Sequence, residues 1–156
     1  MKIESIAMKK SVIIFIILAS FISCLQNTKS KEKEYLNKAI KEASIGGNYQ
    51  WMVILPGLGC HGCIQEAEFF MKEYITDNRI LFVLTKVSSL KILQQKTEVR
   101  INEHSNILID KNNLFVIPTN NRIYPCVAQL KNGIVIAHNF QSPRNSAFYQ
   151  LEQQLK

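Results

Sequence analysis

The stretch WMVILPGLGCHGC at residues 51–63 begins with five apolar residues, turns at Pro56-Gly57 and ends with two cysteines. An apolar run of this length predicts a strand that is buried on both faces of a sheet. Beyond Cys60, apolar residues recur at intervals of three and four, which is typical of a helix lying on a sheet. The sequence therefore predicts a strand, a turn and a helix, with Cys60 and Cys63 in the first turn of that helix.

Two thiols one helical turn apart predict redox chemistry. The first turn of a helix presents unpaired N–H groups and the positive end of the helix dipole, which favour thiolate over thiol. In such a position the pKa of a cysteine falls from about 8.5 to roughly 3.5–7.5. A thiolate at Cys60 can attack a disulfide, and Cys63 is near enough to release the partner from the resulting mixed disulfide. We therefore expect Cys60 and Cys63 to form a redox-active disulfide.

The cysteine pair has two other interpretations, a structural disulfide and half of a zinc site. A zinc site normally needs a second Cys pair or a His pair at a characteristic spacing, and none follows here. A haem attachment site needs His directly after the second cysteine, where this chain has Ile64. We predict no metal and no other cofactor.

The rest of the chain predicts a central mixed sheet. A second apolar run at residues 80–84 completes a strand, helix and strand within about 35 residues, as in a right-handed crossover with parallel strands. Asn132-Gly133 supplies the positive φ angles of a tight hairpin turn. Further strands are expected at 106–109, 127–130 and 134–137, and further helices at 35–43, at 88–95 and from Ser142-Pro143 onward. The predicted fold class is α/β, with a parallel βαβ half and a C-terminal antiparallel hairpin plus helix.

The N-terminal residues predict an exported protein. Lys9 and Lys10 precede an uncharged apolar run at residues 11–23, which is too short for a bilayer span and fits a signal peptide. Cys24 follows directly, and the residues before it resemble the lipobox of bacterial lipoproteins. We expect Cys24 to be lipidated after cleavage. The alternative is an ordinary secretory signal or a short membrane anchor, with Cys24 incidental.

These features divide the chain into three parts. We expect a signal peptide at 1–23, a lipid-anchored tether with a short helix at 24–47 and one folded domain at 48–156. The formal net charge is +7 for the whole chain, but Lys and Glu alternate in the tether and no basic stripe is interleaved with aromatic residues. The sequence argues against nucleic acid as a partner and predicts a periplasm-facing place in the bacterial cell envelope.

Most of the predicted domain resembles the thioredoxin-like superfamily, and within it the TlpA/ResA type of envelope thiol-disulfide oxidoreductase. The resemblance lies in Cys60-x-x-Cys63 between a strand and a helix, in Glu66 three residues later, and in Tyr124-Pro125 before the hairpin. It implies a thioredoxin-like fold with Cys60 as the attacking thiol and Cys63 as the resolving thiol. It also implies that Glu66 is a carboxylate near the pair and that Pro125 is preceded by a cis peptide bond.

The chain departs from the family pattern on both sides of the first cysteine. The family usually has Trp before the first cysteine and Pro before the second, where this chain has Gly59 and Gly62. His61, if protonated, can support the Cys60 thiolate, or it is an exposed spacer. Cys126 next to Pro125 is either an accessory thiol or a buried and inert core residue.

The chemistry of Glu66 has two interpretations as well. The carboxylate can relay a proton to or from Cys63, which requires partial burial, or it is an ordinary helix-surface residue. Glu68 beside it fits the second description.

We predict an enzyme that reduces or exchanges disulfides in client proteins of the envelope, with a membrane electron donor or acceptor for the Cys pair. One alternative is a copper-binding module in which Cys60, Cys63 and either His61 or Cys126 hold Cu(I). Another is a redox-inactive lipoprotein on the same fold. A peroxidase of the peroxiredoxin type would, by resemblance, need Thr or Ser where the chain has Gly57.

Overall fold

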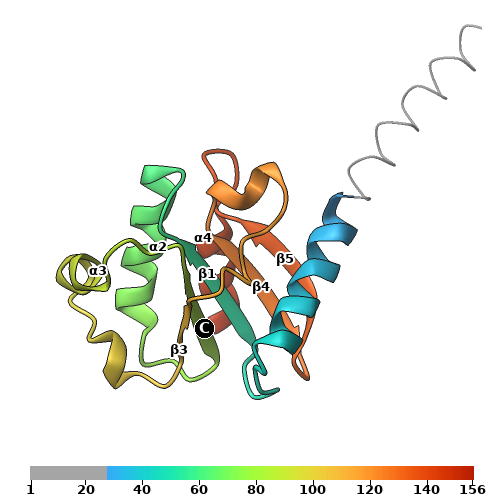
Figure 1. Ribbon diagram of the computed structural model, residues 1–156, viewed down its shortest axis with the longest axis horizontal. Helices are drawn as coiled ribbons and strands as arrows, with labels where there is room; N and C mark the ends of the chain where they lie inside the picture. Colours follow the sequence, from blue (N-terminus) through green and yellow to red (C-terminus); the bar gives the residue numbers. More distant parts are fainter. Residues whose placement is uncertain (1–27) are drawn as a thin grey trace, which may run out of the picture. The chain divides into compact units, whose positions relative to one another are not determined.

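One mixed sheet organises the part of the chain that the computed structural model describes, residues 28–156 (Figure 1). The strands are β1 (Trp51–Pro56), β2 (Ile80–Thr85), β3 (Ile107–Asp110), β4 (Cys126–Lys131) and β5 (Ile134–Phe140), in the spatial order β3-β2-β1-β4-β5. β2 runs parallel to both β1 and β3, whereas β4 runs antiparallel to β1 and β5. The predicted α/β class, with a parallel βαβ half and a C-terminal hairpin, is confirmed.

The chain divides into two units, Met1–Glu32 and Lys33–Lys156. Of the first unit, residues 28–32 are described and are helical. The predicted signal peptide and the predicted lipidation site Cys24 lie outside the described residues. No helix between residues 28 and 156 combines the length and the apolar character that a membrane span requires.

Alternate residues of the central strands face two separate hydrophobic cores. In β1, Val53 and Leu55 face the first core, whereas Met52 and Ile54 face the second. The first core is covered by helices α2 (His61–Tyr74), α3 (Leu90–Thr97) and α4 (Ala147–Leu155). The second core is covered by the helical residues 33–42 and by the segment 114–117. β1 is buried along its whole length because both faces are covered, as the apolar run predicted.

The folded unit begins earlier in the chain than the sequence predicted. Leu36 is 0% exposed and Ile40 is 3% exposed, and both pack in the second core. Asn37 Oδ1 accepts a hydrogen bond from the Val135 N–H of β5 at 2.8 Å, and Lys33 Nζ donates to the Ile136 carbonyl at 3.2 Å. The folded unit therefore begins at Lys33 and not near Asn48, and it includes the short helix that the sequence predicted at 35–43. The apolar residues on one side of the helical segment 33–42 pack against the sheet, so this segment is part of the domain.

Two helix starts differ from the prediction. α3 begins at Leu90, because Ser89 is its N-cap and accepts from the Ile92 N–H at 3.3 Å. α4 begins at Ala147 and not at Pro143. The backbones of Ser142 and Asn145 bond each other twice, at 3.0 Å each, and this small turn delays the helix.

The hairpin turn is confirmed in place and in conformation. Asn132 and Gly133 have φ angles of 53° and 75°, as a two-residue turn between β4 and β5 requires. This turn matters for the site because it sends β4 back beside β1. The first residue of β4, Cys126, is paired with Ile54 of β1 in the strand register.

Candidate active site

Cys60 and Cys63 are joined by a disulfide at the carboxyl end of β1, with 5.3 Å between their Cα atoms. Cys60 is the N-cap residue of α2, with extended backbone at φ −65° and ψ 103°, and Cys63 lies within the first turn. Cys63 is buried, at 5% exposure, whereas Cys60 is partly exposed. An incoming thiol or disulfide can therefore reach Cys60 more easily than Cys63.

The first turn of α2 carries no acidic residue. The positive end of the helix dipole is consequently not offset by a carboxylate on that turn. The backbone carbonyl of Cys60 accepts from the Ile64 N–H at 2.9 Å, which closes the first turn over the pair. This placement favours a thiolate at Cys60 in the reduced form.

Gly59 explains why the residue before the first cysteine departs from the family pattern. Its φ angle is +153°, and a Cβ atom there would collide with the backbone carbonyl of Ile123. The next residue, Cys60, donates its N–H to the same Ile123 carbonyl at 2.9 Å. A side chain at position 59 would therefore push the 120–124 turn away from the cysteines. Gly62 differs, since a Cβ there would meet nothing within 4 Å.

Pro125 comes two residues after Ile123, whose carbonyl accepts from the Cys60 N–H, but it does not have the expected conformation. None of the peptide bonds of the described residues is cis, so the prediction of a cis bond before Pro125 is wrong. Tyr124 has φ −108° and ψ 142°, the extended conformation that a trans proline favours in the residue before it. The Tyr124 N–H bonds the Asn121 carbonyl at 3.0 Å, which fixes this conformation.

Glu66 is an exposed residue of α2, one turn beyond Cys63, and it has one specific partner. Its carboxylate accepts a hydrogen bond from the side-chain amide of Gln141. Gln141 is itself 5% exposed, and its Oε1 accepts from the Phe148 N–H in α4 at 3.1 Å. Its backbone N–H donates to the Pro125 carbonyl at 2.9 Å.

Gln141 thus connects Glu66, Pro125 and the first turn of α4. Sequence reasoning did not identify it. A single glutamine after a strand has no periodicity and no motif, and only its contacts distinguish it.

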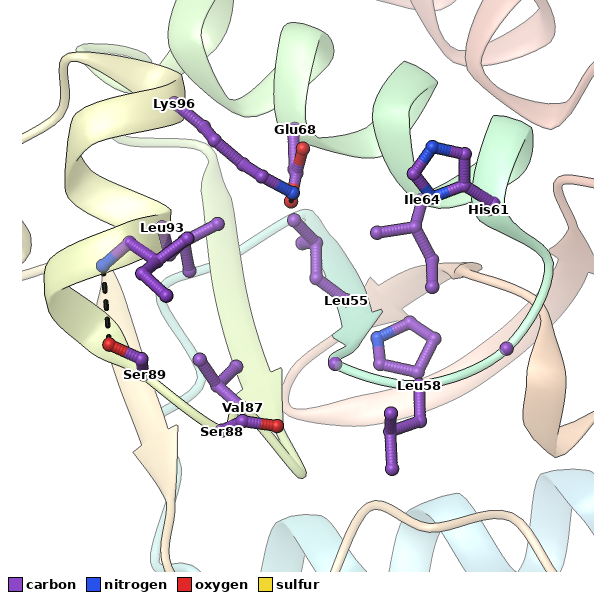
Figure 2. Close-up of a pocket in the computed structure, with 14 residues that line it drawn as sticks. Leu55, Leu58, His61, Ile64, Glu68, Val87, Ser88, Ser89, Leu93 and Lys96 are labelled. Carbon is purple, nitrogen blue, oxygen red and sulfur yellow. Dashed lines mark hydrogen bonds and ion pairs between the residues drawn. The ribbon is translucent and has the colours of Figure 1, made fainter.

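His61 is exposed and lines a cavity of about 290 Å³ between α2 and α3. Figure 2 shows Leu55 and Leu93 around this cavity, with His61 beyond Ile64 at the start of α2. The ion pair between Lys96 and Glu68, at 3.5 Å, lies on its rim. The cavity is mainly apolar, and the position of His61 agrees with the exposed-spacer interpretation.

Cys126 is 1% exposed, outside the disulfide, and packed in the second core. It faces the side of the sheet opposite α2, which agrees with the interpretation as a buried core residue. It also lines a second cavity, of about 340 Å³, together with Leu58 and Gly59. In the described part of the chain, no three His, Cys, Asp or Glu residues form a group that could hold a metal ion.

The predicted site residues therefore fall into two groups. Cys60, Cys63 and the turn leading to Pro125 meet at one end of the sheet, with Glu66 one helical turn away. His61 faces solvent, and Cys126 faces the other core. Neither a model of a known protein family nor a curated protein matches this chain.

Proposed function

We propose that this protein is a thiol-disulfide oxidoreductase with a thioredoxin-like fold of the TlpA/ResA type. The observation that carries the proposal is the Cys60–Cys63 disulfide, placed at a helix N-terminus with Cys60 partly exposed and Cys63 buried. A structural disulfide has no need of such an asymmetry. A redox pair needs it, because the first thiol must meet a partner and the second must be shielded from it.

The proposed cycle starts from the reduced pair. The Cys60 thiolate attacks one sulfur of a client disulfide, a bond forms between these two sulfurs, and the client's other sulfur leaves as a thiolate. Cys63 then loses its proton and attacks Cys60. The Cys60–Cys63 disulfide forms, the second client thiol is released, and two electrons have passed from the pair to the client.

A second dithiol protein restores the pair by the same steps in reverse. The same steps in reverse also let the Cys60–Cys63 disulfide oxidise a client dithiol. This direction requires that a stronger oxidant regenerates the disulfide afterwards. We place this exchange in the bacterial envelope, with Cys24 as a lipid anchor. The support is the apolar run at residues 11–23 directly before Cys24 and the persistence of disulfides in oxidising compartments.

The test uses the purified full-length chain in a Cys24→Ser background, so that only three thiols are present. The reduced protein is mixed with insulin, and free thiols are alkylated at intervals and counted by mass spectrometry. We expect Cys60 and Cys63 to become oxidised together while insulin chains separate. Cys63→Ser should accumulate a mixed disulfide on Cys60, and Cys60→Ser should be inactive.

Cys126→Ser serves as the matched control and should behave as the parent protein does. A Cys60→Ser variant that reduces insulin as fast as the parent protein would refute the proposal. Retention of copper after dialysis, lost in Cys63→Ser, would instead favour the binding module.

A further inference from the structure

A groove between α2 and α4 extends to Gly62, the residue before Cys63, and is not used by the proposed cycle. We call it the α2–α4 groove, and its volume is about 550 Å³. It is lined by Gly62, Gln65, Glu66, Phe69, Phe70, Gln141, Ser146, Phe148, Tyr149 and Glu152. Gly62 stands between the two cysteines, and the space above it is open. A chain segment in the groove would therefore reach the first turn of α2, which carries Cys63.

Four aromatic side chains line the groove. The rings of Phe70 and Phe148 stack at its base, with centroids 4.8 Å apart and planes inclined by 21°. Phe69 and Tyr149 are also part of its lining and are 64% and 62% exposed. Exposed aromatic residues beside a concave surface are typical of sites that bind another protein.

The charge of the groove is opposite to that of the whole chain. The formal net charge of the chain is +7, yet the charged residues that line the groove are Glu66 and Glu152. Neither groove carboxylate takes part in the ion pairs that Glu98, Asp77, Glu68 and Glu103 form in the described part of the chain. The Gln141 amide holds the carboxylate of Glu66, so Glu152 is the groove carboxylate that remains available to an incoming cation.

The second cavity, on the other face of the sheet, has the reverse sign. It is lined by Lys86 and Arg122 and by no acidic residue. The α2–α4 groove and this second cavity thus differ in charge. A partner segment with basic residues would be drawn to the α2–α4 groove and repelled from the other cavity.

We propose that the α2–α4 groove receives the redox partner, as a segment with an aromatic or large aliphatic side chain next to Lys or Arg, close to its reactive cysteine. This inference rests on the proposed function. The apolar side chain packs between Phe69 and Tyr149, and the basic side chain pairs with Glu152. Docking there sets the partner's sulfur beside Cys60.

The test uses the reduced full-length Cys24→Ser chain and three short peptide disulfides that differ only beside the cysteine. The first carries Phe and Arg, the second Phe and Glu, and the third Ser and Arg. Rates of reduction are measured at low salt by alkylation and mass spectrometry. We expect the Phe–Arg peptide to react at least about five-fold faster than each of the other two. High salt should remove the advantage over the Phe–Glu peptide.

Two variants test whether these peptide preferences arise in the α2–α4 groove. Glu152→Lys should reverse the preference between Arg and Glu, and Tyr149→Ser should abolish the preference for Phe over Ser. Ile92→Ser is the matched control, because Ile92 is 55% exposed but lies on α3, outside the groove. It should leave all three rate ratios unchanged.

The neutral bis(2-hydroxyethyl) disulfide separates the two hypotheses. If the protein reduces it but handles the three peptides equally, the groove proposal is overturned and the oxidoreductase stands. Charge selectivity that survives in Glu152→Lys would overturn it as well. If the protein reduces none of the four probes, the proposed function fails and this inference fails with it.

Discussion

The side-chain amide of Gln141 donates a hydrogen bond to the carboxylate of Glu66 and so links the end of β5 to the middle of α2. Gln141 cannot turn freely, because Phe148 N–H occupies its oxygen at 3.1 Å and its backbone bonds Pro125. Glu66 is therefore held by a partner that is itself fixed. This matters for chemistry because Glu66 stands one helical turn from Cys63, whose thiol must lose a proton before it can attack.

We expect Gln141→Leu to slow the resolving step by about five-fold, since a hydrogen bond of this kind contributes about 1 kcal/mol. Glu66→Gln should slow the same step by about ten-fold or more if the carboxylate accepts the proton. The measurement is the lifetime of the mixed disulfide between Cys60 and a peptide thiol. Glu73→Gln, on an exposed residue of α2 outside the α2–α4 groove, is the control.

The double variant decides whether Gln141 acts through Glu66. If it does, Gln141→Leu adds nothing once Glu66→Gln is present. If the fold-changes of the two single variants multiply in the double variant, Gln141 does not act through Glu66.

The two glycines beside the cysteines should respond in opposite ways to alanine. Gly59→Ala places a Cβ atom against Ile123 at a φ of +153°, and we expect it to lower the free energy of unfolding by about 2 kcal/mol or more. Gly62→Ala meets open space inside a helix, and we expect it to raise that free energy by about 0.5–1 kcal/mol. Urea unfolding of the oxidised proteins measures both. Equal effects of the two changes would contradict the packing described for Gly59.

The helical residues 33–42 should be required for a stable domain. Leu36→Ala removes a side chain that is 0% exposed, and we expect a loss of about 2–5 kcal/mol in the free energy of unfolding. A chain that begins at Asn48 loses the whole helix. It also exposes the backbone of β5, where Asn37 and Lys33 now bond Val135 and Ile136.

We therefore expect the chain from Asn48 to unfold or aggregate, and the chain from Lys33 to remain folded and monomeric. Circular dichroism and size-exclusion chromatography distinguish the two. Tyr149→Ala, on an exposed residue, provides the comparison for Leu36→Ala. A stable, monomeric fragment from Asn48 would support the tether that the sequence predicted.

The parts of the fold that sequence predicted correctly are those with a repeating pattern. Apolar runs located β1 and β2, the spacing of three and four located α2, and Asn132-Gly133 located the hairpin. Each of these patterns reflects a local geometric requirement, so one segment suffices to recognise it. The errors arose where a distant segment decides the outcome. The sequence predicted a helix at 35–43, but that this helix packs on the sheet and belongs to the domain could not be predicted from its own residues.

The same distinction holds at the candidate site. Cys60 and Cys63 could be paired from their spacing, because one helical turn fixes their separation. The trans bond before Pro125 and the Glu66–Gln141 contact could not be predicted. They depend on the 120–124 turn and on the loop after β5, which no local pattern specifies.

The ion pair between Asp77 and Arg79 makes the stability of the fold depend on pH in the acid range. Arg79 donates to both carboxylate oxygens of Asp77, at 3.0 and 2.7 Å, and its Nη2 also bonds the Leu155 carbonyl at 3.1 Å. The hydrogen bonds from Arg79 hold the pKa of Asp77 below its usual value. Because the folded-state pKa is depressed, the pair stabilises the fold above the unfolded-state pKa of about 3.9. That contribution is lost as the pH falls through the folded-state pKa.

We expect Asp77→Asn to reduce the free energy of unfolding at pH 7 by less than about 1 kcal/mol, since solvent screens the pair. At pH 2 the difference in stability between the variant and the parent protein should be smaller than at pH 7, because protonation progressively removes the charge of Asp77 below its unfolded-state pKa. Urea unfolding at the two pH values measures the difference. Glu103→Gln is the control, because the Arg100–Glu103 pair is 79% and 61% exposed and should contribute nothing measurable. A cost of Asp77→Asn that is equal at both pH values would assign the effect to packing of the turn, and not to the charge of Asp77.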